Sequence, residues 1–352
     1  MAWLLTDSGH WALALVPVLV LLAVFTWLDA YRLMSFREIA VMLLLGGLAA
    51  SASYPVSGVF LDRLPIGFSF YSRFVAPWIE EAIKAVAIVL LFRLNRIGYK
   101  LDAVICGFAI GAGFSVVENI IYLLRFPDYA AGTWLVRGLG TAVMHGTTLA
   151  VLAAIAHELA ERKTRGAAGD FHFNLLWFVP GYFIAVAIHT AFNQFPDQPL
   201  LAMMGATVVA PLALIAIFQF GSAEADRWLH IEHAEHVAQV QTLRSGAWPD
   251  SAAGRKIAGL AERVGPEAAT RIRRYWELQA WLIAEAEETM IEEAAGDAEF
   301  DANEIRAALA ELDGLRRALG RSTAAALAAL LPFSRNDYWE LSELRQRLHK
   351  RG

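Results

Sequence analysis

Long apolar stretches separated by short polar segments make up most of the first 220 residues. A helix needs about 20 apolar residues to cross the hydrocarbon core of a membrane. Seven stretches meet this requirement: 11–30, 38–60, 72–92, 101–124, 134–157, 174–195 and 199–220. The pattern therefore predicts an all-α fold, a polytopic membrane bundle of about seven transmembrane helices.

Beyond residue 220 the pattern changes to amphipathic helices with polar breaks between them. Residues 255–292 and 302–319 each carry apolar residues at helical spacing, which gives one apolar face. The segment SGAWPDSAAG at 245–254 is typical of a loop. We therefore expect a membrane domain at 1–220, followed by a helical C-terminal region at 221–352.

The charge distribution follows the same division. Residues 1–220 carry 13 Lys and Arg against 13 Asp and Glu, whereas residues 221–352 carry 17 against 22. The formal net charge of −5 thus belongs to the tail, and no basic stripe is present, which argues against a nucleic-acid partner. The single cysteine, Cys106, excludes an internal disulfide or a thiolate metal site, and we expect it to be a packing residue.

Lysine and arginine are unevenly divided between the two sets of loops. The loops after the first, third and fifth stretches carry eight of them, and the opposite loops carry four. Because cytoplasmic loops are enriched in these residues, we predict a multi-pass protein of the cell (inner or plasma) membrane. Its N-terminus is expected outside and its acidic tail in the cytoplasm.

Several ionisable or strongly polar side chains lie inside the apolar stretches. A charge at mid-membrane costs at least about 2.5 kcal/mol, so such residues are functional candidates by default. They are Glu80, Glu81 and Lys84 in FVAPWIEEAIKAVAIVLLF, Glu118 and Asn119 in the fourth stretch, His145 in the fifth, and His189 and Asn193 in the sixth.

Four of these residues are predicted to lie at one depth. Consecutive spans run in opposite directions and each residue rises 1.5 Å. Counted from the outer ends of their helices, Glu80, Glu118, His145 and His189 fall within roughly 8 Å of one another in the outer half of the bilayer. The pattern therefore predicts a single site built from four helices.

Helical spacing adds detail to this site. Glu80 and Lys84 are four residues apart, which suits an internal ion pair, whereas Glu81 lies about 100° around the helix. One glutamate is expected to pair with Lys84 and the other to project into the bundle, and the spacing leaves open which does which. In the fourth stretch Phe114 shares a face with Glu118, and small-residue pairs such as Gly107 and Gly111 let another helix approach closely.

The sequence HIEHAEH offers a second group of histidines, His230, His233 and His236. Their spacing of three residues drifts around a helix. We therefore interpret them as a polar face just below the membrane rather than as a metal site.

Four motifs in order resemble the PrsW family of intramembrane proteases. They are EEAIK at 80–84, GFSVVEN at 113–119, His145, and HTAFN at 189–193, all within residues 74–193. The PrsW family is similar in turn to the CAAX-processing and bacteriocin-processing protease superfamily. Glu118 stands where that superfamily has a histidine, a substitution typical of the PrsW branch.

The resemblance implies cleavage of a membrane-anchored protein, which for PrsW itself is an anti-sigma factor cut on the extracytoplasmic side. It also implies that Glu80 and Glu81 form the catalytic motif, with Lys84 as their electrostatic partner. The tail lies outside the resemblance and is a candidate regulatory region that binds a cytoplasmic partner.

Two mechanisms for activating water remain open. In the first, Glu118, His145 and His189 bind Zn²⁺ with a fourth position open, and a glutamate of the pair is the base. In the second, Glu80 or Glu81 acts without metal together with Glu118 or a histidine, while His189 and Asn193 hold the oxyanion.

Two other classes of function are considered. Buried Glu, Lys and His also form the proton relays of transporters and channels, although no inverted repeat is evident here. The other alternative is a membrane protein that binds partners without cleaving them.

Overall fold

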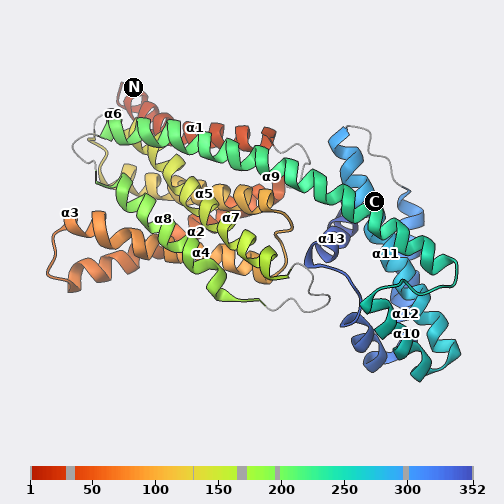
Figure 1. Cartoon of the computed structure of the whole chain (residues 1–352). Helices are drawn as coiled ribbons and strands as arrows, with labels where there is room; N and C mark the ends of the chain where they lie inside the picture. The colour runs from red at the N-terminus through yellow and green to blue at the C-terminus, as the bar shows by residue number, and fades with distance from the viewer. Residues whose placement is uncertain are drawn as a thin grey trace. The chain divides into compact units, whose positions relative to one another are not determined.

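The computed structural model describes residues 2–28, 36–129, 131–164, 173–194, 199–295 and 301–350. Within these ranges every regular element is a helix, which confirms the predicted all-α fold (Figure 1). The chain forms two compact units. The first combines Met1–Ala160 with Asn174–Ser222, and the second combines Glu161–Phe173 with Ala223–Gly352.

The first unit is a helical bundle, and two π-helical segments interrupt its helices. Its elements are α1 (Ala2–Leu28), α2 (Phe36–Arg63), α3 (Phe68–Phe70), η1 (Tyr71–Val75), α4 (Ala76–Arg93), α5 (Lys100–Arg125), α6 (Ala131–Leu135), η2 (Val136–Thr141), α7 (Ala142–Thr164), η3 (Leu175–Phe178), α8 (Val179–Phe192) and the first part of α9 (Pro199–Arg244).

Four segments of the described chain are long and apolar enough to cross a membrane. They are Phe36–Arg63, Lys100–Arg125, Gly132–Glu161 and Leu175–Phe192. A helix also occupies each of the other three stretches picked out from the sequence, and α4 among these carries the charged motif EEAIK. The structure is thus a helical membrane bundle, while the count of seven spans stays a prediction.

Helix α5 is the centre of the bundle. Every residue from Leu101 to Ser115 is buried. Added Cβ atoms at Gly107 and Gly111 would overlap the backbone of α7, and one at Gly113 would overlap the backbone of α2 at Leu43. The glycines therefore let α5 lie in backbone contact with both neighbours, as the small-residue spacing predicts.

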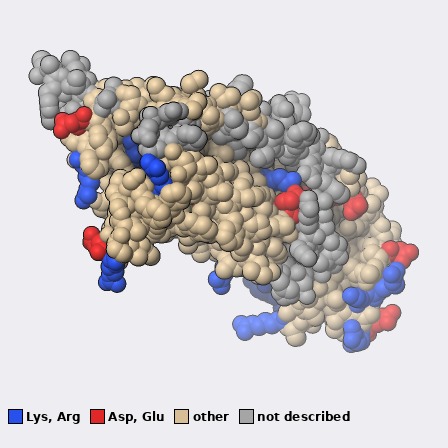
Figure 2. All heavy atoms as spheres, turned by 60° about the vertical axis from the view of Figure 1, so that its left-hand side comes forward, with Lys and Arg blue, Asp and Glu red and all other residues tan. Residues whose placement is uncertain are grey.

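The outer faces of the bundle are apolar. Large apolar side chains are exposed on three helices: Leu44 and Leu48 on α2, Val86 and Leu90 on α4, and Phe183 on α8. Figure 2 shows one face of the molecule, on which a broad area carries no Lys, Arg, Asp or Glu side chain among the described residues. Such continuous apolar surface is suited to contact with lipid rather than water.

The second unit has its own apolar core. Its helices are the end of α9, α10 (Ala252–Val264), α11 (Pro266–Ala295), α12 (Ala302–Ala328) and α13 (Arg335–Lys350). The prediction of one helix over 255–292 is wrong, because Gly265 adopts a φ of 94° and Pro266 begins a new helix. Trp276 and Ile283 of α11 are fully buried and pack with Leu312 of α12 in the core of this unit.

Gly46 and Gly58 on α2 provide a matched test of the close packing. A Cβ at Gly46 would overlap the carbonyl oxygen of Ile110 on α5, whereas nothing lies within 4 Å of one at Gly58. We expect Gly46→Ala to destabilise the protein by about 1–3 kcal/mol through overpacking. Gly58→Ala should be neutral or slightly stabilising, because alanine favours helix over glycine by about 1 kcal/mol.

The measurement is thermal unfolding of both variants in the same detergent. Equal melting temperatures for the two variants would contradict the close α2–α5 contact.

Candidate active site

Glu81 lies at the centre of a buried polar cluster between α4, α7 and α8. Its carboxylate is inaccessible to solvent, and Oε1 lies 2.6 Å from Lys84 Nζ and 2.8 Å from His189 Nδ1. Thr148 of α7 also donates its hydroxyl to the same oxygen at 3.3 Å. Glu81 therefore holds three helices together through one carboxylate oxygen.

The structure assigns different surroundings to the two adjacent glutamates. Lys84 pairs with Glu81, three residues away, and not with Glu80, which the four-residue spacing favoured. Glu80 Oε2 instead lies 3.8 Å from His189 Nε2, so the two glutamates face opposite nitrogens of one imidazole. Among the described residues no lysine or arginine forms an ion pair with Glu80.

Glu118 of α5 is held between a histidine and an arginine. Its Oε2 lies 3.2 Å from His145 Nε2, and its Oε1 lies 3.1 Å from Arg137 Nη2. The Arg137 guanidinium stacks over the Tyr122 ring at 3.5 Å. Because both oxygens are engaged and the arginine is itself packed, the orientation of this carboxylate is fixed.

His145 connects the lysine on α4 to the glutamate on α5. Lys84 Nζ lies 2.9 Å from His145 Nδ1, and a lysine ammonium only donates hydrogen bonds. The hydrogen of the neutral ring is therefore on Nε2, which donates it to Glu118. The His145 ring also packs against Phe114 at 4.8 Å and His189 at 4.9 Å, measured between ring centroids.

The two asparagines anchor the site to the π-helical segments. Asn193 donates to the carbonyl of Ser72 in η1 at 2.9 Å. Asn119 donates to the carbonyl of Arg137 in η2 at 3.2 Å and accepts from its Nε at 3.2 Å. The Asn193 amide is thus hydrogen-bonded to η1, and its oxyanion role stays a prediction.

Two residues of the site were missed from the sequence. Arg137 is one of the four basic residues that the loop count places on the outer side, and Thr148 is not among the candidates from the sequence. The available signal for Arg137 was its position at the start of an apolar stretch, eight residues before His145. No comparable signal marks Thr148, since membrane helices commonly contain threonine.

A set of metal-ligand atoms is present in this cluster. Glu80, His145 and His189 each offer one atom, and the three atoms lie within 4.8 Å of one another. Two imidazoles and a carboxylate suit Zn²⁺, so the residues present fit a metal ion. This set contains Glu80, whereas the set predicted from the sequence contains Glu118. A cation at His145 Nε2 would replace the hydrogen there, so binding is coupled to proton release.

Residues 35–219 match the family model for PrsW family intramembrane metalloproteases. The chain belongs to this family. The match runs from α2 to the first part of α9 and covers every site residue above, so the protein is an intramembrane peptidase, as the four motifs predict. The C-terminal region lies beyond the match. Comparison with curated proteins and with solved structures gave no match.

The interpretation of HIEHAEH as a single polar face rather than a metal site is wrong for one of its histidines. His230 is exposed, but His236 is buried and its Nδ1 lies 2.9 Å from Glu287 Oε1 of α11. Because residues three apart do not lie directly above one another on a helix, His230 and His236 face different surroundings, one exposed and one buried. Cys106, by contrast, is buried, as predicted for a packing residue.

Lys84 is predicted to stabilise the fold by neutralising Glu81. Lys84→Met leaves a buried carboxylate without its cation, which should destabilise the protein by about 3–5 kcal/mol. Adding Glu81→Gln should recover much of this loss. The control is Lys100→Met, because the partly exposed Lys100–Glu158 pair at 2.8 Å should contribute less than about 1 kcal/mol.

Thermal unfolding in detergent measures all three variants. The double variant melting no higher than Lys84→Met would show that the ion pair is not the stabilising interaction.

Proposed function

We propose that the protein hydrolyses a peptide bond of a membrane-anchored protein at the site where Glu80, His145 and His189 converge. The observation that carries this proposal is the approach of their three ligand atoms to within 4.8 Å. They meet inside the apolar bundle of a chain that belongs to a family of intramembrane metalloproteases.

Glu80, His145 and His189 would hold the metal ion in this proposal. The ion supplies a Lewis acid and an activated water for attack on the peptide carbonyl. Glu81 positions His189, because its carboxylate accepts the Nδ1 hydrogen and leaves Nε2 facing Glu80. A carboxylate that accepts a hydrogen bond from the second ring nitrogen of a metal-binding histidine fixes the orientation and the tautomer of the ring.

Glu118 is the proposed proton acceptor. It lies against His145 but is not among the three grouped donors, and it is one-fifth exposed, whereas Glu81 is inaccessible. Arg137 holds one of its oxygens and Asn119 holds Arg137 in turn. A carboxylate so oriented is suited to take a proton from water and deliver it to the leaving amine.

The substrate class and the topology extend this proposal. The resemblance to PrsW favours a single-span regulator such as an anti-sigma factor as substrate. The distribution of Lys and Arg in the loops favours an outside N-terminus and a cytoplasmic tail, which we propose binds a cytoplasmic partner. In this orientation the site lies in the outer half of the membrane.

Cleavage of a tagged single-span reporter, co-reconstituted in vesicles, tests the function. Glu80→Gln and His189→Ala should each reduce the cleavage rate at least about 100-fold, because each removes a proposed ligand. Glu158→Gln is the matched control, since it lies on the same bundle at the other end of α7 and should cleave normally. Unchanged cleavage by Glu80→Gln would refute the proposal.

Metal content distinguishes the two proposed glutamate roles. Glu80→Gln should lose both bound zinc and activity, whereas Glu118→Gln should keep the zinc and lose activity by about 100-fold or more, as expected for a general base. Elemental analysis of the purified membrane protein, alongside the reporter assay, measures both. If Glu118→Gln lost the zinc and Glu80→Gln retained it, Glu118 would be the metal ligand and Glu80 the proton acceptor.

A further inference from the structure

A second group of metal-binding residue types lies inside the C-terminal unit, which the family match does not reach. The end of α9, α11 and α13 each contribute side chains to it (Figure 1). We call this group the tail cluster; its members are Glu232, His233, His236, Glu287, Asp337 and Glu340.

Glu287 is at the centre of the tail cluster. Its Oε1 lies 2.9 Å from His236 Nδ1, and its Oε2 lies 3.7 Å from His233 Nδ1, beyond hydrogen-bond distance. Glu287 is fully buried, and within the described part of the chain Oε2 accepts no hydrogen bond. A buried carboxylate oxygen without a donor costs free energy unless something else binds it.

The ligand atoms of the cluster are close enough to share an ion. One atom from each of His236, Glu287 and Asp337 lies within 4.8 Å of the others, and all three residues are buried. Asp337 also caps the start of α13 through Ser334, which fixes its carboxylate in place. The second group, Glu232, Glu287 and Glu340, shares Glu287 with the first.

The charges of the tail cluster also favour a cation. Four carboxylates approach one another, and the histidines are the basic residues that ion-pair with Glu287.

We propose that the tail cluster binds a divalent transition-metal ion through His236, Glu287 and Asp337, separately from the protease site. An imidazole with carboxylates favours Zn²⁺, Mn²⁺ or Fe²⁺ over Ca²⁺ and Mg²⁺, which prefer all-oxygen sites. Metal sites inside helical bundles are built from Glu, Asp and His on facing helices in this way.

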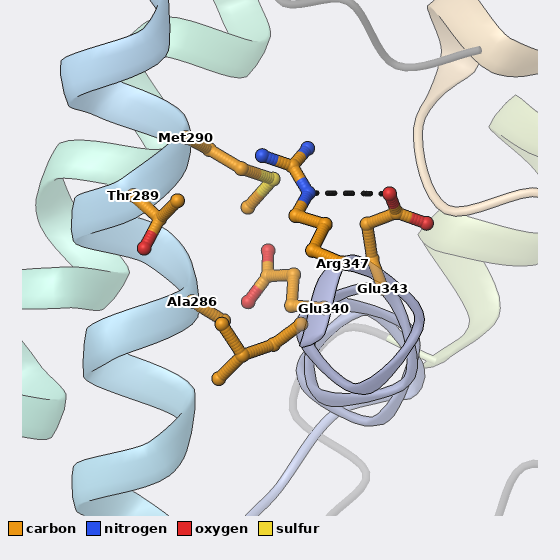
Figure 3. A pocket seen from close by; sticks show the side chains of 7 residues that line it. Ala286, Thr289, Met290, Glu340, Glu343 and Arg347 are labelled. Carbon is orange, nitrogen blue, oxygen red and sulfur yellow. Dashed lines mark hydrogen bonds and ion pairs between the residues drawn. The ribbon is translucent and has the colours of Figure 1, made fainter. Parts of the chain in front are cut away.

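A shallow pocket borders the cluster at Glu340. Figure 3 shows Glu340 extending from α13 toward Ala286 of α11, with Glu343 and Arg347 on the same helix. Arg347 Nε and Glu343 Oε1 form an ion pair at 3.2 Å.

Metal retention by the full-length protein tests the proposal. The background protein carries Glu80→Gln and His189→Ala, which removes the protease donors and leaves the tail cluster. After loading with Co²⁺ and dialysis, we expect it to retain about one ion per chain, with visible absorption bands characteristic of imidazole and carboxylate ligands. Adding Glu287→Gln should lower the retained metal at least about 10-fold.

Glu288→Gln is the matched control, because Glu288 is the next residue on α11 and is exposed. It should retain the metal. Should Glu287→Gln fail to fold, His236→Gln in the same background should shift or abolish the Co²⁺ bands, since it removes the nitrogen ligand. A background protein that retains no Co²⁺, or Glu287→Gln and His236→Gln variants that retain it with unchanged spectra, would overturn the proposal.

Discussion

The ion pair between Lys84 and Glu81 is the interaction on which the membrane site depends. Both side chains are inaccessible to solvent and their charged atoms are 2.6 Å apart. Each partner then makes a second contact on another helix, Lys84 with His145 on α7 and Glu81 with His189 on α8. Burying two charges is costly unless further hydrogen bonds satisfy them. The contacts of Lys84 Nζ and Glu81 Oε1 fix the two imidazoles, while Glu81 Oε2 has no hydrogen-bond partner among the described residues.

This arrangement explains why the motif has two glutamates and a lysine in place of a single carboxylate. Glu81 is occupied by structural contacts and carries the negative charge that Lys84 balances. Glu80 points its carboxylate at the other nitrogen of His189 and is partly accessible. One glutamate thus orients the site, and the other is available to a metal ion or to water.

The glycines of α5 are a second requirement, because they set how closely the helices approach. Gly111 lets the backbone of α5 contact that of α7 beside His145, and Gly113 does the same for α2. Glu118 lies on α5 and His145 on α7, so the 3.2 Å contact between their side chains depends on the close approach of these two helices. The π-helical segments η1 and η2 also contribute, because their carbonyls accept hydrogen bonds from Asn193 and Asn119.

The sequence by itself determined the all-α fold, the family, and that Glu80, Glu118, His145 and His189 come together from four helices. The fold and the meeting of these residues follow from apolar periodicity and from the high cost of charge in lipid, and the family follows from the resemblance of the four motifs. Only the tertiary structure decided three other features. It determined which glutamate pairs with Lys84, that Arg137 and Thr148 are part of the site, and that His236 is buried. Helical spacing places both glutamates within reach of Lys84 and favours Glu80, and only the packing of α7 and α8 against α4 selects Glu81.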